Sequence, residues 1–276
     1  MKWTPEAEAA VKKVPFFVRK RVRARVEIEA RAEGKPIVSL AEVKATQARY
    51  LNNMEKEIKG YRIDACFGGG GCPNKAVDSE ELFRNLETLL QKEGLLGLLK
   101  ARVQGPLKFH HEFSVTLADC PNACSRPQIK DVGIVGAAVP AVTDKPCTLC
   151  ESCVAVCKEG AVSLDTDAEQ PVLDRSACLD CGQCAAECPS GTLVTGRTGW
   201  RVFLGGKLGR HPRLAQELPG IFDADEVLAI VKACIDFYRK RSLHGERFAA
   251  LLTQPDFEDF AERFGKAGLI CAPLQD

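Results

Sequence analysis

The pattern of apolar and polar positions separates a helical first part of the chain from a second part that mixes strands and helices. A short helix is predicted to begin after Thr4, which has the side chain of an N-cap and is followed by a proline. A second helix is predicted over 15–33, and a third over 40–59 after a capping box that begins at Ser39. Residues 1–60 are therefore predicted to form a small all-α module.

The second part of the chain alternates between two periodicities. Period-two alternation of apolar residues predicts strands, and an apolar stripe at helical spacing predicts helices. The predicted strands are 63–65, 113–117, 132–139 and 201–204, and the predicted helices are about 79–94, 225–243 and 246–264. The fold class predicted for the whole chain is therefore α+β.

Composition narrows the classes of function. The 276 residues carry a net charge of +1, so overall charge gives no reason to expect a nucleic acid or an anionic membrane as partner. The longest apolar stretches are interrupted by glycine and too short to span a bilayer, and the first residues lack the pattern of a secretion signal. We expect a cytoplasmic protein without a membrane span.

Cysteine spacing is the strongest chemical signal. Twelve of the fourteen cysteines fall into three groups, which suits metal ligation in a reducing compartment better than disulfides. Two of the groups repeat the spacing C-x2-C-x2-C-x3-C, which is typical of four-iron clusters, with zinc as the structural alternative. These are Cys147, Cys150, Cys153 and Cys157, and then Cys178, Cys181, Cys184 and Cys188. Cys234 and Cys271 lie outside all groups, and Cys234 is expected to be a buried small apolar residue.

The two repeats predict a two-cluster ferredoxin domain over 141–196. Residues 147–164 align with 178–195, as expected for a duplicated unit. In bacterial ferredoxins of this type the fourth cysteine of each motif binds the other cluster. We therefore expect Cys188 to join the first three cysteines of the first motif, and Cys157 to join those of the second. Lys158 stands where a proline is usual, although it replaces no ligand.

The third group resembles siroheme-dependent sulfite and nitrite reductases. The matching segments are 65–73 (ACFGGGGCP), 119–129 (DCPNACSRPQI), 131–136 (DVGIVG) and 205–210 (GGKLGR). The resemblance implies a siroheme and [4Fe-4S] α/β domain formed by 61–140 and 197–276, with the ferredoxin domain inserted as in dissimilatory and small anaerobic sulfite reductases. It implies a [4Fe-4S] cluster on Cys66, Cys72, Cys120 and Cys124, with Cys124 also reaching the siroheme iron.

Siroheme carries several carboxylates, so basic side chains near the cysteine motifs are candidate contacts. The alternative for each of them is an ordinary surface charge. The candidates are Arg126, Lys130, Arg197, Arg201, Lys207, Arg210 and Arg213.

The chain departs from this family in two places. Two lysines that hold the oxyanion in the family fall on Glu112 and Ser114 when aligned back from Cys120. Nothing in the sequence resembles the additional half-domain that closes the substrate cavity. Residues 1–50 instead resemble the small helical domain of a light-independent protochlorophyllide reductase subunit, through 3–7 (WTPEA) and 14–19 (VPFFVR), although a generic three-helix packing module is the alternative.

These patterns predict an oxidoreductase that passes electrons from ferredoxin clusters to a siroheme-coupled [4Fe-4S] centre and reduces sulfite or nitrite. No nucleotide-binding loop is present, so we expect a protein electron donor, and a partner subunit or a second copy is possible. No catalytic residue is assigned from the sequence. Two alternatives stay open, an iron–sulfur electron-transfer subunit and a siroheme-binding accessory protein, both without substrate turnover.

Overall fold

The computed structural model describes residues 1–14, 16–67 and 71–266. The chain divides into two compact units, Met1–Ile58 with Val103–Phe109, and Lys59–Arg102 with His110–Asp276. Cys271 therefore lies outside the described residues. No helix among the described residues is long and apolar enough to cross a membrane.

The first unit contains the three predicted helices. They are α1 (Pro5–Lys12), α2 (Phe16–Ala32) and α3 (Leu40–Glu57), and a short parallel pair of strands, β1 (Lys2–Trp3) and β2 (Ile37–Val38), was not predicted. The Thr4 side chain caps α1 by accepting from the Ala7 amide at 3.4 Å. Ala7, Val26, Ala30 and Val38 form one buried apolar cluster of this unit.

The second unit is built on a five-stranded mixed sheet with the order β3-β4-β5-β8-β9. The strands β3 (Tyr61–Ala65), β4 (Phe113–Ala118) and β5 (Val132–Val142) are parallel. The strands β8 (Leu193–Leu204) and β9 (Gln216–Glu217) then pair antiparallel. The four predicted strands, 63–65, 113–117, 132–139 and 201–204, are all present, and each of them is longer than predicted.

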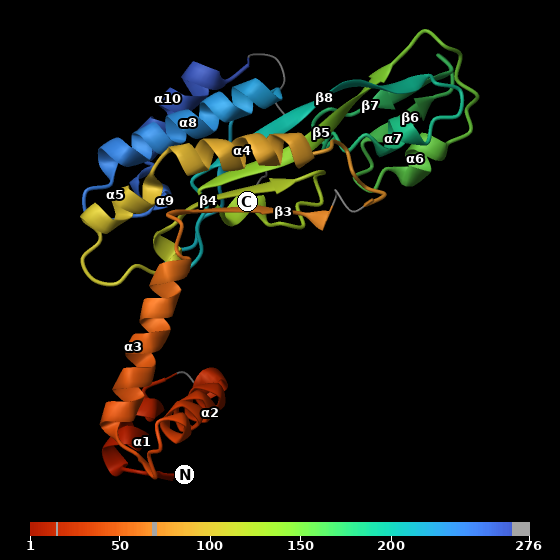
Figure 1. Ribbon diagram of the computed structural model, residues 1–276. Coiled ribbons are helices and arrows are strands. Elements are labelled where there is room, and N and C mark those ends of the chain that lie inside the picture. Colours follow the sequence, from red (N-terminus) through yellow and green to blue (C-terminus); the bar gives the residue numbers. More distant parts are fainter. Residues whose placement is uncertain (15, 68–70, 267–276) are drawn as a thin grey trace. The chain divides into compact units, whose positions relative to one another are not determined.

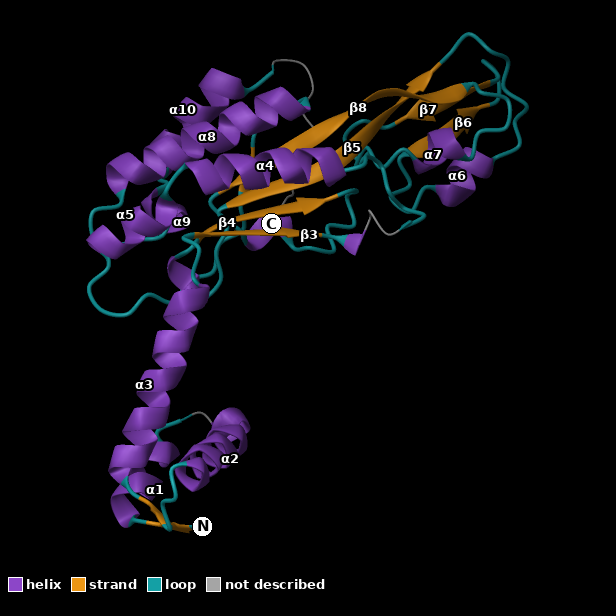
Figure 2. Ribbon diagram, viewed as in Figure 1, coloured by secondary structure: helices purple, strands orange, loops and turns teal. Residues whose placement is uncertain are grey.

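Helices cover one face of this sheet (Figures 1 and 2). They are α4 (Glu80–Lys92), α5 (Leu95–Arg102), α8 (Ala224–Arg241), α9 (Phe248–Leu251) and α10 (Gln254–Phe264). The Phe113 ring of β4 contacts the Tyr238 ring of α8 and the Phe248 ring of α9, with centroids 5.7 and 5.4 Å apart. This apolar layer fixes the sheet, and so fixes where each strand ends.

The ribbon of β5 and β8 carries the predicted ferredoxin segment at its far end (Figure 2). Its register runs from Val132 opposite Leu204 to Val142 opposite Leu193, with a shift at Pro140. The segment between the strands is 143–192, and it contains α6 (Ser152–Val156), β6 (Val162–Asp165), β7 (Gln170–Leu173) and α7 (Gln183–Ala186). The insertion is therefore an extension of the sheet itself.

Gly136 of β5 is a position where only glycine fits. A Cβ atom there would lie 2.5 Å from the Asp119 carbonyl oxygen and 2.8 Å from its carbon. We predict that Gly136→Ala lowers the free energy of unfolding by about 1–3 kcal/mol, because backbone must move to accept the methyl group. Denaturant unfolding followed by circular dichroism measures this change.

Gly97→Ala is the matched control, because a Cβ atom at Gly97 of α5 would meet no atom within 4 Å. We expect this variant to be unchanged or more stable by up to about 1 kcal/mol, since alanine is the better helix former. Equal destabilisation by both variants would contradict the steric account of Gly136.

Candidate metal centres

The first candidate centre lies where the parallel strands β3 and β4 end. Carboxyl ends of parallel neighbours meet at one edge of a sheet, and Cys66 directly follows β3 while Cys120 lies two residues beyond β4. The Cys66 amide donates to the Leu117 carbonyl at 3.0 Å, and the Asp119 amide donates to Cys66 Sγ at 3.2 Å. Strand pairing therefore brings together two cysteines that are far apart in the sequence.

The four thiols of this group differ in their exposure. Cys120 is buried, Cys66 and Cys72 are partly buried, and Cys124 is exposed. Burial raises the pKa of the Cys120 thiol, and the neighbouring sulfurs of Cys66, Cys72 and Cys124 raise it further. The other three predicted ligands thus each lie near Cys120, and Cys124 is the exposed member of the group.

The loop that holds Cys120 and Cys124 has a constrained backbone. Ala123 and Arg126 adopt left-handed conformations with φ of 49° and 60°, which cost non-glycine residues about 1–2 kcal/mol each. The Arg126 amide donates to the Ala123 carbonyl at 2.8 Å, and the Ser125 hydroxyl donates to the Leu117 carbonyl at 2.6 Å. These bonds hold the loop in a shape that its sequence alone does not favour.

Asp119 connects this loop to the loop that follows Cys72. Its carbonyl accepts from the amides of Ala76 and Val77 at 2.9 and 3.1 Å. Its carboxylate accepts from the Ser79 hydroxyl at 2.5 Å, and both residues are buried. The other carboxylate oxygen, Oδ2, is buried and has no hydrogen-bond partner among the described residues. The sequence did not indicate this role, because only the fold brings Ser79 to Asp119.

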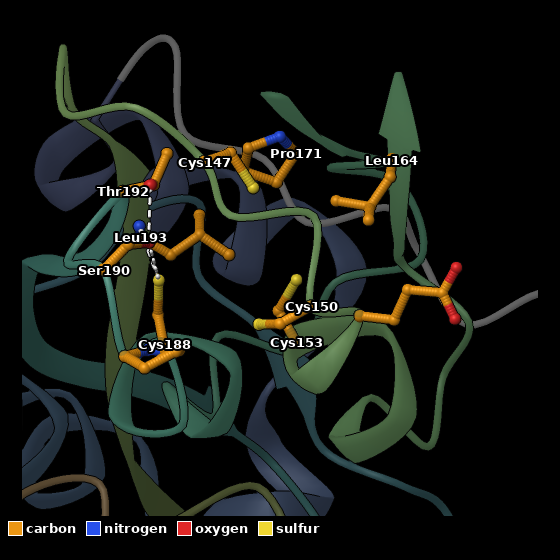
Figure 3. Close-up of a pocket in the computed structure, with 11 residues that line it drawn as sticks. Cys147, Cys150, Cys153, Leu164, Pro171, Cys188, Ser190, Thr192 and Leu193 are labelled. Carbon is orange, nitrogen blue, oxygen red and sulfur yellow. Dashed lines mark hydrogen bonds between the residues drawn. The ribbon is translucent and has the colours of Figure 1, made fainter. Parts of the chain in front are cut away.

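The insertion contains two cavities, each lined by four cysteines in the crossed combination. One is lined by Cys147, Cys150, Cys153 and Cys188 (Figure 3). The other is lined by Cys157, Cys178, Cys181 and Cys184. The structure therefore brings together the two sets that the ferredoxin pattern predicted. We call them the outer group and the inner group, in that order.

Burial and neighbouring sulfurs also shape the acidity of these thiols. Burial raises the pKa of Cys184 to about 11, helped by Cys178, Cys181 and Cys157. Burial likewise raises the pKa of Cys153, with Cys147 and Cys188 as neighbours. Cys150 is the opposite case, because hydrogen bonds with the hydroxyl and backbone of Ser152 and with the Thr148 side chain lower its pKa to about 7.

Backbone amides point at several of these sulfurs. Four backbone amides donate to cysteine Sγ atoms at 3.3–3.4 Å. They are the amides of Leu149 to Cys147, Ala161 to Cys157, Asp180 to Cys178 and Leu193 to Cys188. Amide donors favour the ionised thiolate over the thiol. No three histidine, cysteine or acidic side chains in the described part of the chain converge closely enough to hold a single metal ion.

The inner group is joined directly to the sheet. The Ala138 amide of β5 donates to the Asp180 carbonyl at 2.7 Å, and Ala138 forms a bridge with Cys181. Two residues earlier on the same strand, Gly136 lies against Asp119. Strand β5 thus contacts both the inner group and the loop of the Cys120 group.

The seven candidate cations have different surroundings. Lys130 pairs with Asp64 at 3.0 Å, and Arg201 binds both carboxylate oxygens of Glu217 at 2.5 and 2.6 Å. Arg197 donates to the Ile221 carbonyl, and Arg213 donates to the carbonyls of Gly205, Ala249 and Leu252.

Arg126, Lys207 and Arg210 are different, because their side chains form no hydrogen bond or ion pair with any described residue. Arg126 and Arg210 are exposed, and Lys207 is partly buried. The loops that carry them touch, since a Cβ atom at Gly206 would lie 2.3 Å from the Gln128 carbonyl oxygen. These three cations are therefore available to an anionic ligand.

Glu112 and Ser114 do not face the cysteines. They lie at the beginning of β4, whereas Cys120 follows its end, and both are buried. Glu112 accepts from the Lys59 amide at 2.9 Å, and burial raises its pKa. The Ser114 hydroxyl donates to Asp131 at 2.6 Å. Both side chains therefore have hydrogen-bond partners within the sheet region.

The comparisons with known proteins agree with this arrangement. Residues 60–267 match the family described as "Nitrite and sulphite reductase 4Fe-4S domain", and the chain belongs to this family. It is 30% identical over 200 residues to the coenzyme F420-dependent sulfite reductase of Methanocaldococcus jannaschii, covering 72% of this chain and 30% of that protein. It is 29% identical over 204 residues to one subunit of the anaerobic sulfite reductase of Salmonella typhimurium, covering 72% and 54%. The chain thus spans about half or less of these relatives.

A solved structure is similar in fold, and the first unit has relatives of its own. The crystal structure of dissimilatory sulfite reductase I is similar in fold, with a TM-score of 0.52 and 17% identity over 78% of this chain and 55% of that one. Residues 3–47 match the family "Proto-chlorophyllide reductase 57 kD subunit". One subunit of the light-independent protochlorophyllide reductase of Pelodictyon phaeoclathratiforme is 58% identical over 40 residues, which are 14% of this chain and 8% of that protein. Both predicted resemblances are confirmed.

We predict that Ser79→Ala lowers the free energy of unfolding by about 1–3 kcal/mol, because it removes the hydroxyl partner of the buried Asp119 carboxylate. Ser163→Ala, at an exposed position of β6, is the control and should change stability by less than about 0.5 kcal/mol. Urea unfolding of the two variants under one set of conditions makes the comparison. A Ser79→Ala protein as stable as the control would show that Asp119 does not depend on this bond.

Proposed function

We propose that this chain is the iron–sulfur and siroheme-binding part of an oxidoreductase of the sulfite and nitrite reductase type. Each of the three cysteine groups would hold one [4Fe-4S] cluster, and Cys124 would also reach the siroheme iron. The observation that carries the proposal is that four cysteines line each of two cavities in the insertion, while strand pairing brings Cys66 beside the Cys120 loop at the end of β3 and β4.

The donor sets fit the proposed clusters. Each set consists of four cysteines, which is the ligand set of a [4Fe-4S] cluster. In both cavities the four sulfurs surround a space instead of converging on one point, whereas zinc holds its sulfurs about 2.3 Å from a single ion. Neighbouring buried thiols resist joint ionisation, so a positively charged metal centre would relieve the repulsion between their thiolates.

The surroundings of Cys124 fit an anionic macrocycle. Cys124 is the exposed member of its group, and Arg126 follows two residues later. We propose that Arg126, Lys207 and Arg210 bind siroheme carboxylates, because the other four candidate cations already have partners within the protein. When bound, siroheme supplies an iron that takes an oxyanion, and reduction of sulfite to sulfide consumes six electrons.

The three cysteine groups lie in an order that suits electron transfer. The outer group includes the exposed Cys150, and the inner group contacts β5 at Ala138. The same strand contacts the loop of Cys120 at Gly136. We propose that a protein donor meets the outer group first, and that the inner group lies between it and the Cys66 group.

The chain spans only part of the sulfite reductases that it resembles. The relative from Salmonella is named a subunit, and the chain spans 54% of it. We therefore propose that a partner subunit or a second copy completes the substrate cavity, with sulfite or nitrite as substrate. The cysteine chemistry also favours a reducing, cytoplasmic setting. An electron-transfer or siroheme-binding role without turnover is the second candidate, favoured by Glu112 and Ser114 at the positions where the family has two lysines.

The crossed grouping predicts how many clusters each pair of cysteine substitutions removes. With three [4Fe-4S] clusters, the unaltered protein holds about twelve irons. Cys157→Ala with Cys184→Ala removes two ligands of the inner group, so about eight irons should remain. Cys157→Ala with Cys153→Ala damages both groups, so about four should remain. Iron and acid-labile sulfide assays on anaerobically purified protein measure this, and the reverse pattern would mean that the motifs bind clusters without crossing.

Cys124→Ser tests the proposed siroheme link. We expect the variant to keep the spectroscopic signals of the outer and inner clusters, while siroheme absorbance and turnover of sulfite or nitrite with a chemical reductant are lost. Cys234→Ala is the control, because Cys234 is buried in α8 and belongs to no group. If turnover and the siroheme spectrum survive in Cys124→Ser, Cys124 is not the bridging ligand.

A further inference from the structure

The insertion carries a charge opposite to that of the rest of the chain. Residues 143–192 contain nine acidic and three basic side chains, a net charge of −6. The whole chain carries +1, so the residues outside the insertion carry +7. A nearly neutral protein thus has a strongly acidic end, and bound thiolates would add to its negative charge.

Most of these acidic residues are exposed and form no ion pair. Eight of the nine are exposed, and Asp180 is the buried one. Among the described residues, none of the ion pairs includes one of these eight exposed carboxylates. The field of the eight exposed carboxylates is therefore directed at the solvent and at whatever approaches this end of the molecule.

Part of this charge lies at the outer group. Glu151 lines the same cavity as Cys147 and Cys150. Leu164 of β6 and Pro171 of β7 line it too, and the turn that joins these strands carries Asp165, Asp167 and Glu169. Carboxylates thus lie beside the cavity and along the turn of the hairpin that closes it.

Apolar side chains accompany the exposed cysteine. Leu149, between Cys147 and Cys150, is 36% exposed, and Val154 of α6 is 37% exposed. An apolar centre with a charged rim is the usual composition of a protein interface. Around a redox centre, the apolar part allows close approach and the charged part guides it.

We propose that the surface formed by Leu149, Cys150, Glu151, Val154 and the turn 165–170 docks an electron donor that presents basic side chains around its own redox group. This acidic surface would attract such a donor and repel acidic proteins. The inference rests on the proposed function, because it requires a cluster in the outer group. It adds the kind of partner and the face on which that partner binds.

The test uses cytochrome c, a basic protein with lysines around its haem edge, as the probe. The protein is reduced with dithionite, freed of excess reductant by anaerobic gel filtration and mixed with ferric cytochrome c in a stopped-flow instrument. One electron leaves a reduced cluster and converts one ferric haem to ferrous haem, and no proton is needed. We expect the second-order rate constant to fall at least about tenfold as ionic strength rises from about 10 mM to about 500 mM.

A triple variant locates the attraction. Glu151→Gln, Asp167→Asn and Glu169→Gln together remove three charges from the proposed surface, and Asp165 is left intact because its carboxylate accepts from the amides of Asp167 and Ala168 in the turn. At low ionic strength this variant should react about three- to tenfold more slowly than the unaltered protein. The control is Glu258→Gln, Asp259→Asn and Glu262→Gln in α10, which removes the same net charge elsewhere and should react within about twofold of the unaltered protein.

Three outcomes would overturn the proposal. They are a rate constant that does not depend on ionic strength, equal slowing by both triple variants, and a salt-sensitive dimer in analytical ultracentrifugation that the insertion variant abolishes while its rate stays unchanged. The last outcome would assign the surface to a second copy of the chain. An iron assay made beforehand separates these results from failure of the proposed function, since a protein without clusters contradicts the function itself.

Discussion

The parallel pairing of β3 with β4 is the contact on which the other features of the site depend. It aligns Tyr61 with Phe113 and Ala65 with Leu117, and so places the residues after both strands at one edge of the sheet. Cys66 then receives a hydrogen bond from Asp119, and the Cys120 loop closes beside it. The apolar layer of α8 and α9 against Phe113 maintains this pairing. Packing on one face of the sheet thus sets the position of thiols at its edge.

Strand β5 connects the Cys120 loop to the insertion. Gly136 of this strand leaves room for the Asp119 backbone to lie directly against it. The Ala138 amide donates a hydrogen bond to the carbonyl of Asp180, which lies beside the inner group. A long antiparallel ribbon is a stiff connection, because every residue pair adds ladder contacts. The insertion is therefore held to the sheet by paired strands instead of by flexible linkers. Such a connection would suit the proposed transfer of electrons between the cysteine groups.

Much of this site could be predicted from the sequence, because cysteine spacing is a local property. The crossed combination of Cys188 with Cys147, Cys150 and Cys153 lines one cavity, as the ferredoxin pattern predicted. The length of β8 could not be predicted, because its exposed half lacks apolar alternation. The Ser79–Asp119 bond was also beyond the sequence, since these residues are 40 positions apart. The buried partners of Glu112 and Ser114, the Lys59 amide and Asp131, were likewise beyond the sequence.

The central claim is that three cysteine groups hold three clusters, one of them coupled to siroheme. The most direct measurement is the iron, zinc, acid-labile sulfide and extractable pigment content of protein purified without oxygen, together with its optical spectrum. We expect about twelve irons, a matching amount of sulfide and one siroheme per chain, with no stoichiometric zinc. About twelve irons without a tetrapyrrole would contradict the siroheme part of the claim. Zinc in place of iron, or no metal at all, would contradict the account as a whole.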